Sequence, residues 1–463
     1  MLSSLPLFAD AFSIFLHGQE DFSMLHYTTS EAIEFIEEND VKFIRLAFCD
    51  IFGVQKNISI MPGELARAFR EGISFDAAAF PGFASPDGSD LLLFPDPTTL
   101  SILPWRPSQG RVVRFYCDIR QPDGQPFPGD GRFLLRQAVR RARERDLTCK
   151  FGTECEFYLF QRDEAGYPTH IPHDRAGYCD IAPLDRAENV RRQVCLTLEE
   201  MDIQPERSHH EQGPGQNEID FQYASPLAAA DNLTTFKSVV KTVASLNGLF
   251  ASFLPKPIPG QPGSGLHINI SLFQGGRNII ETEKGVHSEI SEQFIAGILR
   301  RAHELAAFLN PLTNSYARFG EFEAPRFVSW SHQNRSQLVR IPAAHGDFRR
   351  MELRAPDPTA NPYLAFTLLI HAGLEGIADR LTLPPACNHD LFTAPADVLA
   401  QYELLPGTLH EALAHAQRSA FISSIIPEPL LSSYLAVKAR EWETVSRASD
   451  CKAAEDDLYF ARW

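Results

Sequence analysis

The alternation of hydrophobic and polar residues predicts a small mixed domain in the first part of the chain. The pattern TTSEAIEFIEEND from Thr28 indicates a helix with Thr29 or Ser30 near its N-cap. VKFIRLAFCDIFGVQKNISIM then alternates as a strand, a turn at Gly53 and a second strand. SDLLLFPDPTTLSILPW and GRVVRFYCDI add further strand-like runs. We expect a domain of about 100 residues that ends near the glycine- and proline-rich stretch Gln121–Gly131.

Hydrophobic residues at helical spacing recur along the rest of the chain, with short strand candidates between them. The predicted helices are Arg132–Arg145, Ala187–Met201, Ala228–Leu249, Ser288–Phe308 and Pro362–Asp379. The sequence shows no internal repeat of the kind that builds solenoids. At 463 residues the chain is long enough for two or three domains. The pattern predicts an α+β protein with a large second domain.

Several strand candidates carry polar residues on one face, because side chains at i and i+2 of a strand point the same way. The segments and the residues that share a face are GTECEFYLF with Glu154 and Glu156, GQNEIDFQY with Gln216, Glu218 and Asp220, SGLHINISL with His267, Asn269 and Ser271, and FRRMELRAP with Arg350, Glu352 and Arg354. Each face taken singly is explained most simply by an antiparallel sheet with one solvated side.

Taken together, these faces favour a metal site over a solvated surface. They hold mostly carboxylates with one histidine and arginines, whereas a solvated face mixes Lys, Thr, Ser and Gln. Neighbouring carboxylates repel one another unless cations lie among them. Oxygen ligands with a single imidazole suit Mg²⁺ or Mn²⁺ better than zinc. A multi-metal carboxylate site beside arginines is what phosphoryl transfer from a nucleotide requires. The candidate ligands are Glu154, Glu156, Glu211, Glu218, His267 and Glu352.

A polar loop follows the fourth predicted helix. NPLTNSYARFGEFEAPRF (Asn310–Phe327) carries Arg318, Glu321 and Glu323, and NRSQLVRIP follows with Arg335 and Arg340. A surface loop is the simplest interpretation, but a loop of this length without regular structure is more often a lid or a binding loop. We expect it to lie over the polar faces.

Composition narrows the class of protein further. The formal net charge of −16 argues against binding to nucleic acid or to an anionic membrane surface as the main role. The eight cysteines form no C-x-x-C pair, which favours a reduced, cytoplasmic protein. No apolar run approaches the roughly 20 residues of a membrane span. Residues 1–25 lack the charged start of a signal peptide and are interpreted as an N-terminal extension, with Met24 as a possible translation start.

With these residues in place, the chain resembles the glutamine synthetase family in its type I, bacterial form, from about Tyr27 to the C-terminus. The motifs that carry the resemblance are GTECEFYLF, SHHEQGPGQNEIDF, PKPIPGQPGSGLHINISL, NPLTNSYARF, EAPRFVSW, NRSQLVRIP and RMELRAPDPTANPYLAF. It implies a β-grasp-like domain at 26–128 and a catalytic domain at 129–463, whose antiparallel, funnel-forming sheet is flanked by helices. It also implies a homo-oligomer, a dodecamer of two stacked hexamers, with Asp76 donated to the neighbouring subunit's site.

The resemblance also implies roles for individual residues. One divalent ion is expected at Glu156, Glu211 and Glu218 and a second at Glu154, His267 and Glu352, with two or three Mg²⁺ or Mn²⁺ ions per active site. The Gly-Pro-Gly turn would bring Glu211 onto the ion held by Glu218, and His210 and His209 would join the same wall, His209 less securely. The glutamate-binding residues are Gly263, Arg318, Arg335 and Arg354. The nucleotide-binding residues are Tyr223, Ser271, Arg340 and Arg350. The catalytic residues are Asp76, Tyr178, Glu323 and Arg335, of which the first three match the ammonium-site positions.

The activity that the resemblance implies is ATP-dependent ligation of ammonia to the γ-carboxylate of glutamate. The alternative is a γ-glutamyl-amine ligase for a polyamine or ethanolamine, because the family's FDGSS is FDAAA here and its usual Asn is Pro262. Phe392 replaces the tyrosine that adenylylated members carry. A catalytically inactive homologue is disfavoured because the metal-position ligands and the arginines are all present.

Overall fold

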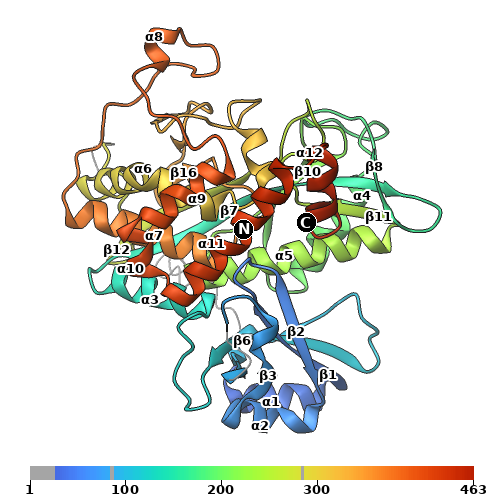
Figure 1. Cartoon of the computed structure of the whole chain (residues 1–463). Coiled ribbons are helices and arrows are strands. Elements are labelled where there is room, and N and C mark those ends of the chain that lie inside the picture. The colour runs from blue at the N-terminus through green and yellow to red at the C-terminus, as the bar shows by residue number, and fades with distance from the viewer. Residues whose placement is uncertain (1–26, 84–87, 283–285) are drawn as a thin grey trace, which may run out of the picture.

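A computed structural model describes residues 27–83, 88–282 and 286–463. The expected extension at 1–25 lies outside these residues. Two sheets organise the chain, a small one built from the N-terminal part and a large one built from the remainder (Figure 1). Helices and strands are mixed in both parts, which confirms the predicted α+β class.

The small sheet follows the order β2-β1-β6-β4-β3, with β5 paired to β6. Its strands are β1 (Val41–Cys49), β2 (Gln55–Ile60), β3 (Ile73–Asp76), β4 (Asp90–Pro95), β5 (Ser101–Ile102) and β6 (Arg111–Arg120). β1 pairs with β6 in parallel and with β2 antiparallel across the turn at Gly53. Helices α1 (Thr29–Glu38) and α2 (Leu65–Glu71) accompany this sheet.

The N-cap of α1 differs from the prediction by one residue or more. Thr28, not Thr29 or Ser30, is the cap, and its hydroxyl accepts a hydrogen bond from the backbone N–H of Glu31. The Glu31 carboxylate accepts one from the backbone N–H of Thr28 in return. This reciprocal capping box decides the helix start, because it satisfies two backbone donors at once.

The large sheet follows the order β14-β15-β16-β12-β7-β10-β9, with β8 and β11 paired to β7 and β13 to β12. Its strands are β7 (Thr148–Arg162), β8 (Pro168–Pro172), β9 (Pro205–His210), β10 (Gln216–Phe221), β11 (Leu249–Ser252), β12 (Leu266–Gln274), β13 (Arg277–Asn278), β14 (Trp330–His332), β15 (Val339–Ile341) and β16 (Met351–Leu353). The four segments predicted to carry polar faces contain β7, β10, β12 and β16. These strands are consecutive neighbours in the sheet, although their order across it, β16-β12-β7-β10, differs from their order along the chain.

The five helices predicted from hydrophobic spacing are present within a few residues of their expected ends. They are α3 (Gly131–Arg143), α4 (Glu188–Glu199), α5 (Pro226–Leu246), α6 (Glu289–Leu309) and α7 (Pro362–Ala378). The remaining helices are α8 (Ala396–Leu399), α9 (Leu409–Arg418), α10 (Ala420–Ile425), α11 (Glu428–Ser446) and α12 (Cys451–Glu455). No described helix is at once long and apolar enough to cross a membrane.

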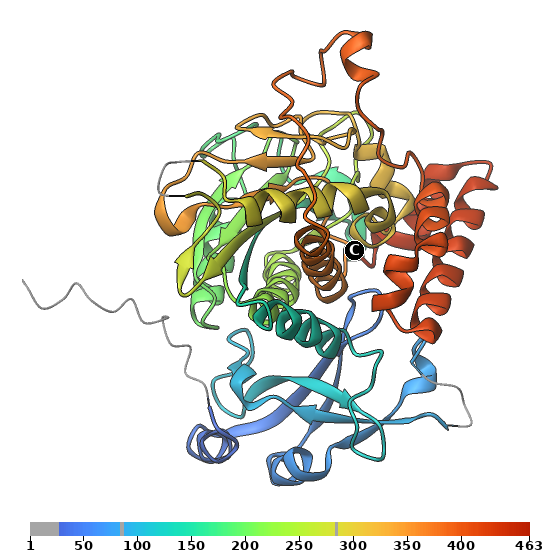
Figure 2. The ribbon, with the colours of Figure 1, turned by 90° about the vertical axis from the view of Figure 1, so that its left-hand side faces the viewer.

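Helices α3, α5 and α7 lie between the small sheet and the large one (Figure 2). Their aromatic side chains cover one face of β7: Phe157 packs on Phe236 of α5 and Phe151 on Phe366 of α7, with ring centroids 6.1 and 4.4 Å apart. Each such buried ring contributes roughly 1.5–3 kcal/mol. Because one face of β7 is occupied in this way, its alternate residues, which include Glu154 and Glu156, must face the opposite side.

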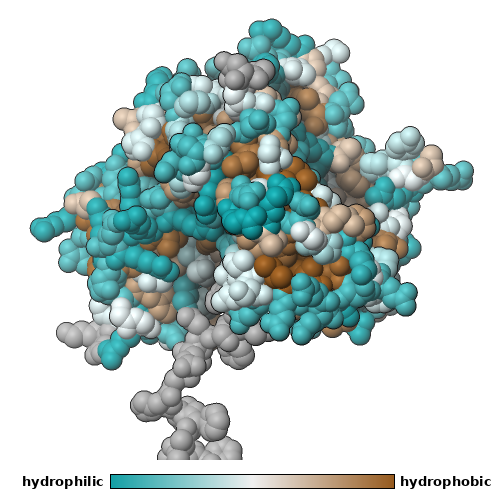
Figure 3. Space-filling view, turned by 90° about the horizontal axis from the view of Figure 1, so that it is seen from below, coloured by the Kyte–Doolittle hydropathy of each residue, from teal (hydrophilic) through white to brown (hydrophobic). Residues whose placement is uncertain are grey.

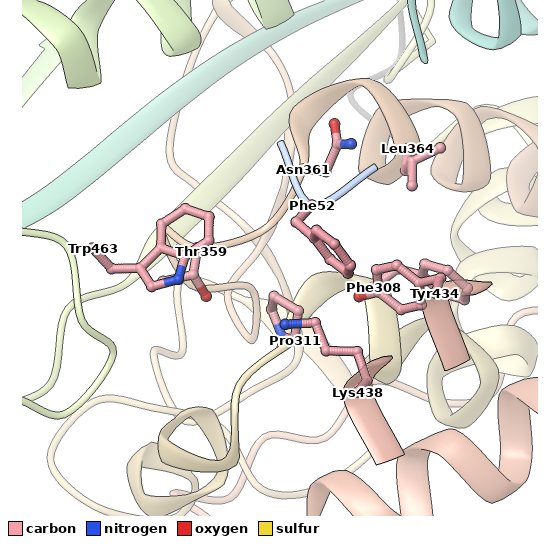
Figure 4. A pocket seen from close by; sticks show the side chains of 9 residues that line it. All are labelled: Phe52, Phe308, Pro311, Thr359, Asn361, Leu364, Tyr434, Lys438 and Trp463. Carbon is pink, nitrogen blue, oxygen red and sulfur yellow. The ribbon is translucent and has the colours of Figure 1, made fainter. Parts of the chain in front are cut away.

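The turn of the small sheet is anchored beneath α7. The Asn361 side-chain amide donates to the backbone carbonyl of Ile51 at 3.2 Å. A side chain at Gly53 would come within 2.8 Å of the Asn361 Cα, so this turn requires glycine. Phe52 points from the turn toward a small cavity that Tyr434 and Trp463 also line (Figure 4). The two parts of the chain are therefore joined by packing as well as by the linker.

Candidate active site

Strand register gathers the predicted ligands on one face of the large sheet. Residues directly opposite one another in an antiparallel pair lie on the same face, about 5 Å apart. One row across the sheet is His209–Glu218–Glu156. The next row is Arg207–Asp220–Glu154–His267, and a third joins Asn269 to Glu352 and Arg340. The polar faces expected from each strand alone thus form one continuous surface.

The glycine turn between β9 and β10 brings Glu211 to this surface. The backbone N–H of Glu211 donates to the carbonyl of Gln216 at 2.9 Å, which closes the turn. Gly215 has a φ of +70°, and a side chain at Gly213 would lie 2.1 Å from the Tyr158 hydroxyl. Both positions therefore require glycine. The Glu211 carboxylate lies 3.0 Å from Nε2 of His209.

Two groups of side chains in the described part of the chain have the geometry of metal sites. The possible ligand atoms of Glu154, His267 and Glu352 lie within 4.8 Å of one another, as do those of His209, Glu211 and Glu218. The first group is the set expected for one ion. In the second group His209 takes the place expected for Glu156, whose carboxylate instead accepts hydrogen bonds from the Gln216 side chain at 2.8 Å and the Gly265 backbone at 2.9 Å. Both donor sets fit a hard divalent ion.

The electrostatics of the face supports this fit. Burial and the neighbouring Glu211 raise the pKa of Glu156 to about 8, and burial with Asp220 raises that of Glu218 well above its ordinary value. Ionised carboxylates would therefore repel one another where Glu156 and Glu218 meet, and a bound cation would relieve this repulsion. Burial would also raise the pKa of Glu154, but its hydrogen bond with His267 lowers it overall.

Arginines surround the Glu352 end of the face. Burial opposes ionisation of Glu352, but Arg354 lowers its pKa below the ordinary value. Arg354 hydrogen-bonds to this carboxylate, and Arg340 donates to it at 2.6 Å. Nε of Arg340 is buried and has no hydrogen-bond partner among the described residues. Arg350 donates to the Asn269 side chain at 2.9 Å.

The predicted lid contacts these arginines. The Glu323 carboxylate lies 3.4 Å from Arg335 and 3.6 Å from Arg354. Its other oxygen accepts a long hydrogen bond of 3.5 Å from Gln212, which follows Glu211 in the glycine turn. The Glu323 side chain remains almost half exposed, at 45%. The loop thus lies at the edge of the polar face, where Glu323 contacts the arginines on one side and Gln212 of the glycine turn on the other.

Gly263 and Arg318 are packed against each other below the lid. Arg318 is buried and donates to the backbone carbonyls of Ala355 at 2.8 Å and Pro356 at 3.2 Å. The Gly263 carbonyl accepts from the Gln216 side chain at 3.1 Å. These contacts place both residues beside the polar face, next to Gly265 and Glu156.

Three further residues named for the site can be placed in the single chain, and one of them, His210, lies elsewhere than expected. His210 does not join the metal-binding wall: it alternates with His209 along β9, so its side chain faces inward and its Nε2 lies 2.9 Å from the Asp174 carboxylate. The Ser271 hydroxyl donates to the backbone carbonyl of Arg349. Asp76 is exposed at the end of β3 in the small sheet, where it caps a short turn by accepting from the Ala78 N–H.

Two aromatic residues lie at opposite margins of the face. Tyr178 is 57% exposed, and its ring meets that of His209 edge to face at 5.4 Å. Burial and the adjacent Cys179 raise its pKa. Tyr223 lies beside Gly152 of β7, with the ammonium of Lys150 5.1 Å from the centre of its ring. Tyr178 therefore borders the His209–Glu218 row, whereas Tyr223 borders the end that carries Asn269.

Sequence reasoning missed Asp174 and Gln212. Asp174 accepts from His210 and from the Gly215 N–H at 3.0 Å, so it fixes the glycine turn from behind. Its proline-rich surroundings give no periodic signal that would single it out. Gln212 lies next to Glu211 in a motif already chosen, but its partner Glu323 is more than one hundred positions away. Only the folded chain shows that they meet.

An extended sheet whose carboxylates, imidazoles and arginines converge on one face, completed by a lid, is the arrangement of a ligase. Two family descriptions match this chain: "Glutamine synthetase, beta-Grasp domain" over residues 40–122 and "Glutamine synthetase, catalytic domain" over residues 128–455. The chain therefore belongs to the glutamine synthetase family, and its small sheet is the β-grasp domain of that family.

Individual relatives agree with this assignment. The chain is 44% identical over 425 residues to the glutamine synthetase of Clostridium saccharobutylicum, covering 91% of this chain and 96% of that protein. It is 43% identical over 422 residues to that of Methanosarcina mazei, covering 90% and 94%. The solved structure named "GmaS/ADP complex-Conformation 1" is similar with a TM-score of 0.82 and 30% identity, over 90% of this chain and 96% of that chain. A Plasmodium falciparum glutamine synthetase, at 22% identity and a TM-score of 0.81, shares the fold over 91% of this chain and 97% of that chain.

Proposed function

We propose that this protein joins ammonia to the γ-carboxylate of L-glutamate through a γ-glutamyl phosphate, with ATP as the phosphate donor and glutamine, ADP and phosphate as products. The observation that supports this activity is the continuous polar face, on which two metal-competent groups lie beside Arg340 and Arg354. The curated relatives at 40–44% identity that are named glutamine synthetase support the same activity.

The metal-binding residues in this proposal are Glu154, His267 and Glu352 for one ion, and Glu211 and Glu218 with Glu156 or His209 for the other. Bound there, Mg²⁺ or Mn²⁺ would offset the negative charge of the phosphoryl group as it is transferred. Arg340 and Arg350 bind the phosphates of the nucleotide, and Tyr223 and Ser271 lie near its adenosine. The unpartnered Nε of Arg340 leaves a donor for such an oxygen.

Glutamate lies between the metal face and the lid in this scheme. Arg335 and Arg354 pair with its carboxylates, while Gly263 and Arg318 shape the floor of the pocket. The γ-carboxylate oxygen attacks the γ-phosphorus of ATP, the bond to the bridging oxygen of ADP breaks, and an acyl phosphate forms. Because an acyl phosphate hydrolyses readily, the loop that carries Glu323 must exclude water until the amine arrives. Its contacts with Gln212 and Arg335 hold it over the site.

Ammonium must become neutral before it can react. The carboxylates of Glu323 in one chain and Asp76 in another attract the cation, with the neutral Tyr178 beside them, and a carboxylate then accepts its proton. The neutral nitrogen attacks the acyl carbon and phosphate leaves. Asp76 lies at the end of β3 in the small sheet, where its carboxylate accepts from the Ala78 N–H. In this proposal the Asp76 of a neighbouring subunit completes the site.

Assembly into two stacked hexamers, which the resemblance to the family implies, would let neighbouring subunits share Asp76 and is part of the proposal. The face that includes the small domain carries hydrophobic patches between hydrophilic residues (Figure 3), and Phe43 and Met61 of this domain are about half exposed, at 49% and 54%. Mass measurement by light scattering should give twelve copies of the 51.8 kDa chain; elution as a monomer would contradict the assembly. All eight cysteines are unpaired, which fits the predicted cytoplasmic location.

A second candidate is a γ-glutamyl-amine ligase that uses a larger amine. Ala77 stands where the family usually has Gly, Ala78 and Ala79 stand where it usually has Ser, and the carbonyl of Pro262 accepts from the Tyr158 hydroxyl at 2.6 Å. The similarity to the GmaS structure at 30% identity is a reason to test amines other than ammonia.

Phosphate release from ATP, Mg²⁺ and glutamate distinguishes the two activities. Parallel reactions receive ammonium, methylamine, putrescine, spermidine or ethanolamine. Turnover with ammonium alone, lost in Asp76→Ala, supports the glutamine synthetase. Turnover only with a larger amine supports the second candidate. No turnover with any amine, together with no calorimetric binding of Mn²⁺ or ATP, would indicate an inactive homologue.

A further inference from the structure

A second cavity, of about 620 Å³, lies on the opposite side of α5 from the polar face. It is lined by β1, β2 and β6 of the small sheet and by one face of α5 together with β7 and β11 of the large part. Phe236 of α5 covers the apolar side of β7, so the helix and the sheet separate this cavity from Glu154 and Glu156. Its volume is in the range of small-molecule sites, roughly 300–1,000 Å³.

Positive charge is concentrated in the wall of this cavity. The basic residues that line it are Arg45, Arg106, Arg114, Arg162 and Lys241, and none of the described residues that line it is acidic. None of the five forms an ion pair within 4.0 Å in the described part of the chain. This is the reverse of the whole protein, whose formal net charge is −16. Five uncompensated cations around one cavity repel one another and favour a bound anion.

The individual side chains leave donors available. Arg114 is 8% exposed, and its Nε is buried without a hydrogen-bond partner among the described residues, although its Nη1 donates to Thr235 at 2.6 Å. The side chains of Arg45 and Arg106 make no hydrogen bond in the described part of the chain, and burial with the nearby Arg106 lowers the pKa of Arg45. Burial lowers the pKa of Lys241 to about 8. Arg162 donates to the backbone carbonyls of Leu249 and Gly166, and Lys241 donates to that of Arg462. The buried Nε of Arg114 and the side chains of Arg45 and Arg106 are therefore the donors left for a ligand.

We propose that this cavity binds a small molecule that carries two or more phosphate groups. Four of the five cations are arginines, whose planar forks match phosphate oxygens two at a time. The α5 hydroxyls of Thr235 and Ser238 add neutral hydrogen-bonding groups, and Trp105 and Phe250 provide apolar walls for the rest of the ligand. Arg45, Arg106 and Arg114 belong to the small domain, whereas Arg162 and Lys241 belong to the large one. The ligand therefore links the two domains at a place distinct from the catalytic face.

The test compares three full-length proteins by titration calorimetry without added metal. They are the wild type, Arg45→Gln/Arg106→Gln, and Arg140→Gln/Arg277→Gln as a control that removes the same charge from exposed positions outside the cavity. The first pair is suitable because neither arginine side chain has a hydrogen bond to lose within the described part of the chain. The probes are inorganic pyrophosphate and ADP: equal binding of both indicates that phosphate alone is recognised, and tighter binding of ADP indicates a contribution from the apolar walls.

The cavity variant should bind pyrophosphate at least about tenfold more weakly than the wild type and the control, because each charge-assisted contact is worth roughly 1.5 kcal/mol or more. Pyrophosphate should also raise the melting temperature of the wild type and the control but not that of the cavity variant. Equal affinity and equal stoichiometry in all three proteins would overturn the proposal, because all binding would then occur elsewhere. If the double variant does not fold, the single variant Arg106→Gln is titrated with pyrophosphate instead, and its affinity is compared with that of the wild type in the same way.

Discussion

Substituting Gly263 by alanine tests whether the floor of the proposed glutamate pocket depends on the close approach of Gly263 to Arg318. An added Cβ would lie 2.3 Å from Cγ of Arg318, 2.8 Å from its Cδ and 2.4 Å from the carbonyl oxygen of Pro255. Ordinary contacts between carbon atoms are about 3.5–4.0 Å. The Pro255 carbonyl is backbone and already accepts from the Ser264 N–H at 2.8 Å. Arg318 must therefore move by more than about 1 Å, and the backbone between Pro255 and Gly263 must also shift to relieve the contact with the carbonyl oxygen.

Movement of Arg318 has a definite free-energy cost. Its guanidinium donates to the carbonyls of Ala355 and Pro356, which are buried with it. Leaving a buried acceptor without its donor costs about 1–3 kcal/mol, and overpacking a core costs a similar amount. We expect a total of about 3 kcal/mol, which corresponds to roughly a 100-fold loss in kcat/KM for glutamate. KM for ATP should change little, because Gly263 lies away from Arg340 and Arg350.

The assay is phosphate release at varied glutamate with saturating ATP and the preferred amine. Gly63→Ala is the matched control, since nothing lies within 4 Å of a side chain added there. Both variants should be compared with the wild type by thermal melting, to separate loss of substrate binding from loss of fold. A Gly263→Ala protein with kcat/KM for glutamate within threefold of the wild type would refute the reasoning.

Three further predictions concern charge and modification. Burial, with Arg141 nearby, lowers the pKa of His371 to about 4. A histidine that is held neutral stabilises the folded protein above pH 6.5, and up to about 3 kcal/mol of this stability is lost as the pH falls toward 4. His371→Gln should therefore show a smaller drop in melting temperature between pH 7 and 4.5 than the wild type or the exposed His345→Gln, and identical pH profiles would contradict this. Glu352→Gln should weaken Mn²⁺ binding by roughly 10- to 100-fold or more in calorimetry, because Arg340 and Arg354 lose the charge that pairs with them; unchanged affinity would remove Glu352 from the ligand set. Phe392 is 40% exposed but has no hydroxyl, so labelled AMP from a cognate adenylyltransferase should not be incorporated, whereas Phe392→Tyr provides the missing acceptor; labelling of the wild type would refute the prediction.

The sequence by itself determined which elements form and which residues share a face. Hydrophobic spacing predicted α3 to α7 because each helix buries one apolar stripe, and alternation predicted the polar sides of β7, β10 and β12 because successive strand residues point in opposite directions. Long motifs then identified the family, and with it the β-grasp and catalytic domains.

Local pattern could not decide where those faces meet. The chain visits β7, β10, β12 and β16 in that order, but the sheet places them as β16-β12-β7-β10. Pairing between strands far apart in sequence, not the periodicity of any one strand, aligns Glu154 with His267 and Glu156 with Glu218. The same pairing assigns His209 to the polar face and His210 to Asp174. Both histidines were expected in the metal-binding wall, His210 more firmly than His209, because two adjacent histidines differ only in which way the strand turns them.

Tertiary packing alone also created the features that no motif marks. The basic cavity behind α5 exists because β1, β6 and α5 approach one another across the two domains, and its arginines are scattered from residue 45 to residue 162. The contact of Gln212 with Glu323 arises in the same way. A sequence specifies such contacts only through the complete fold, because long-range proximity depends on how every intervening element packs, whereas the direction of a side chain on its own strand depends only on its immediate neighbours.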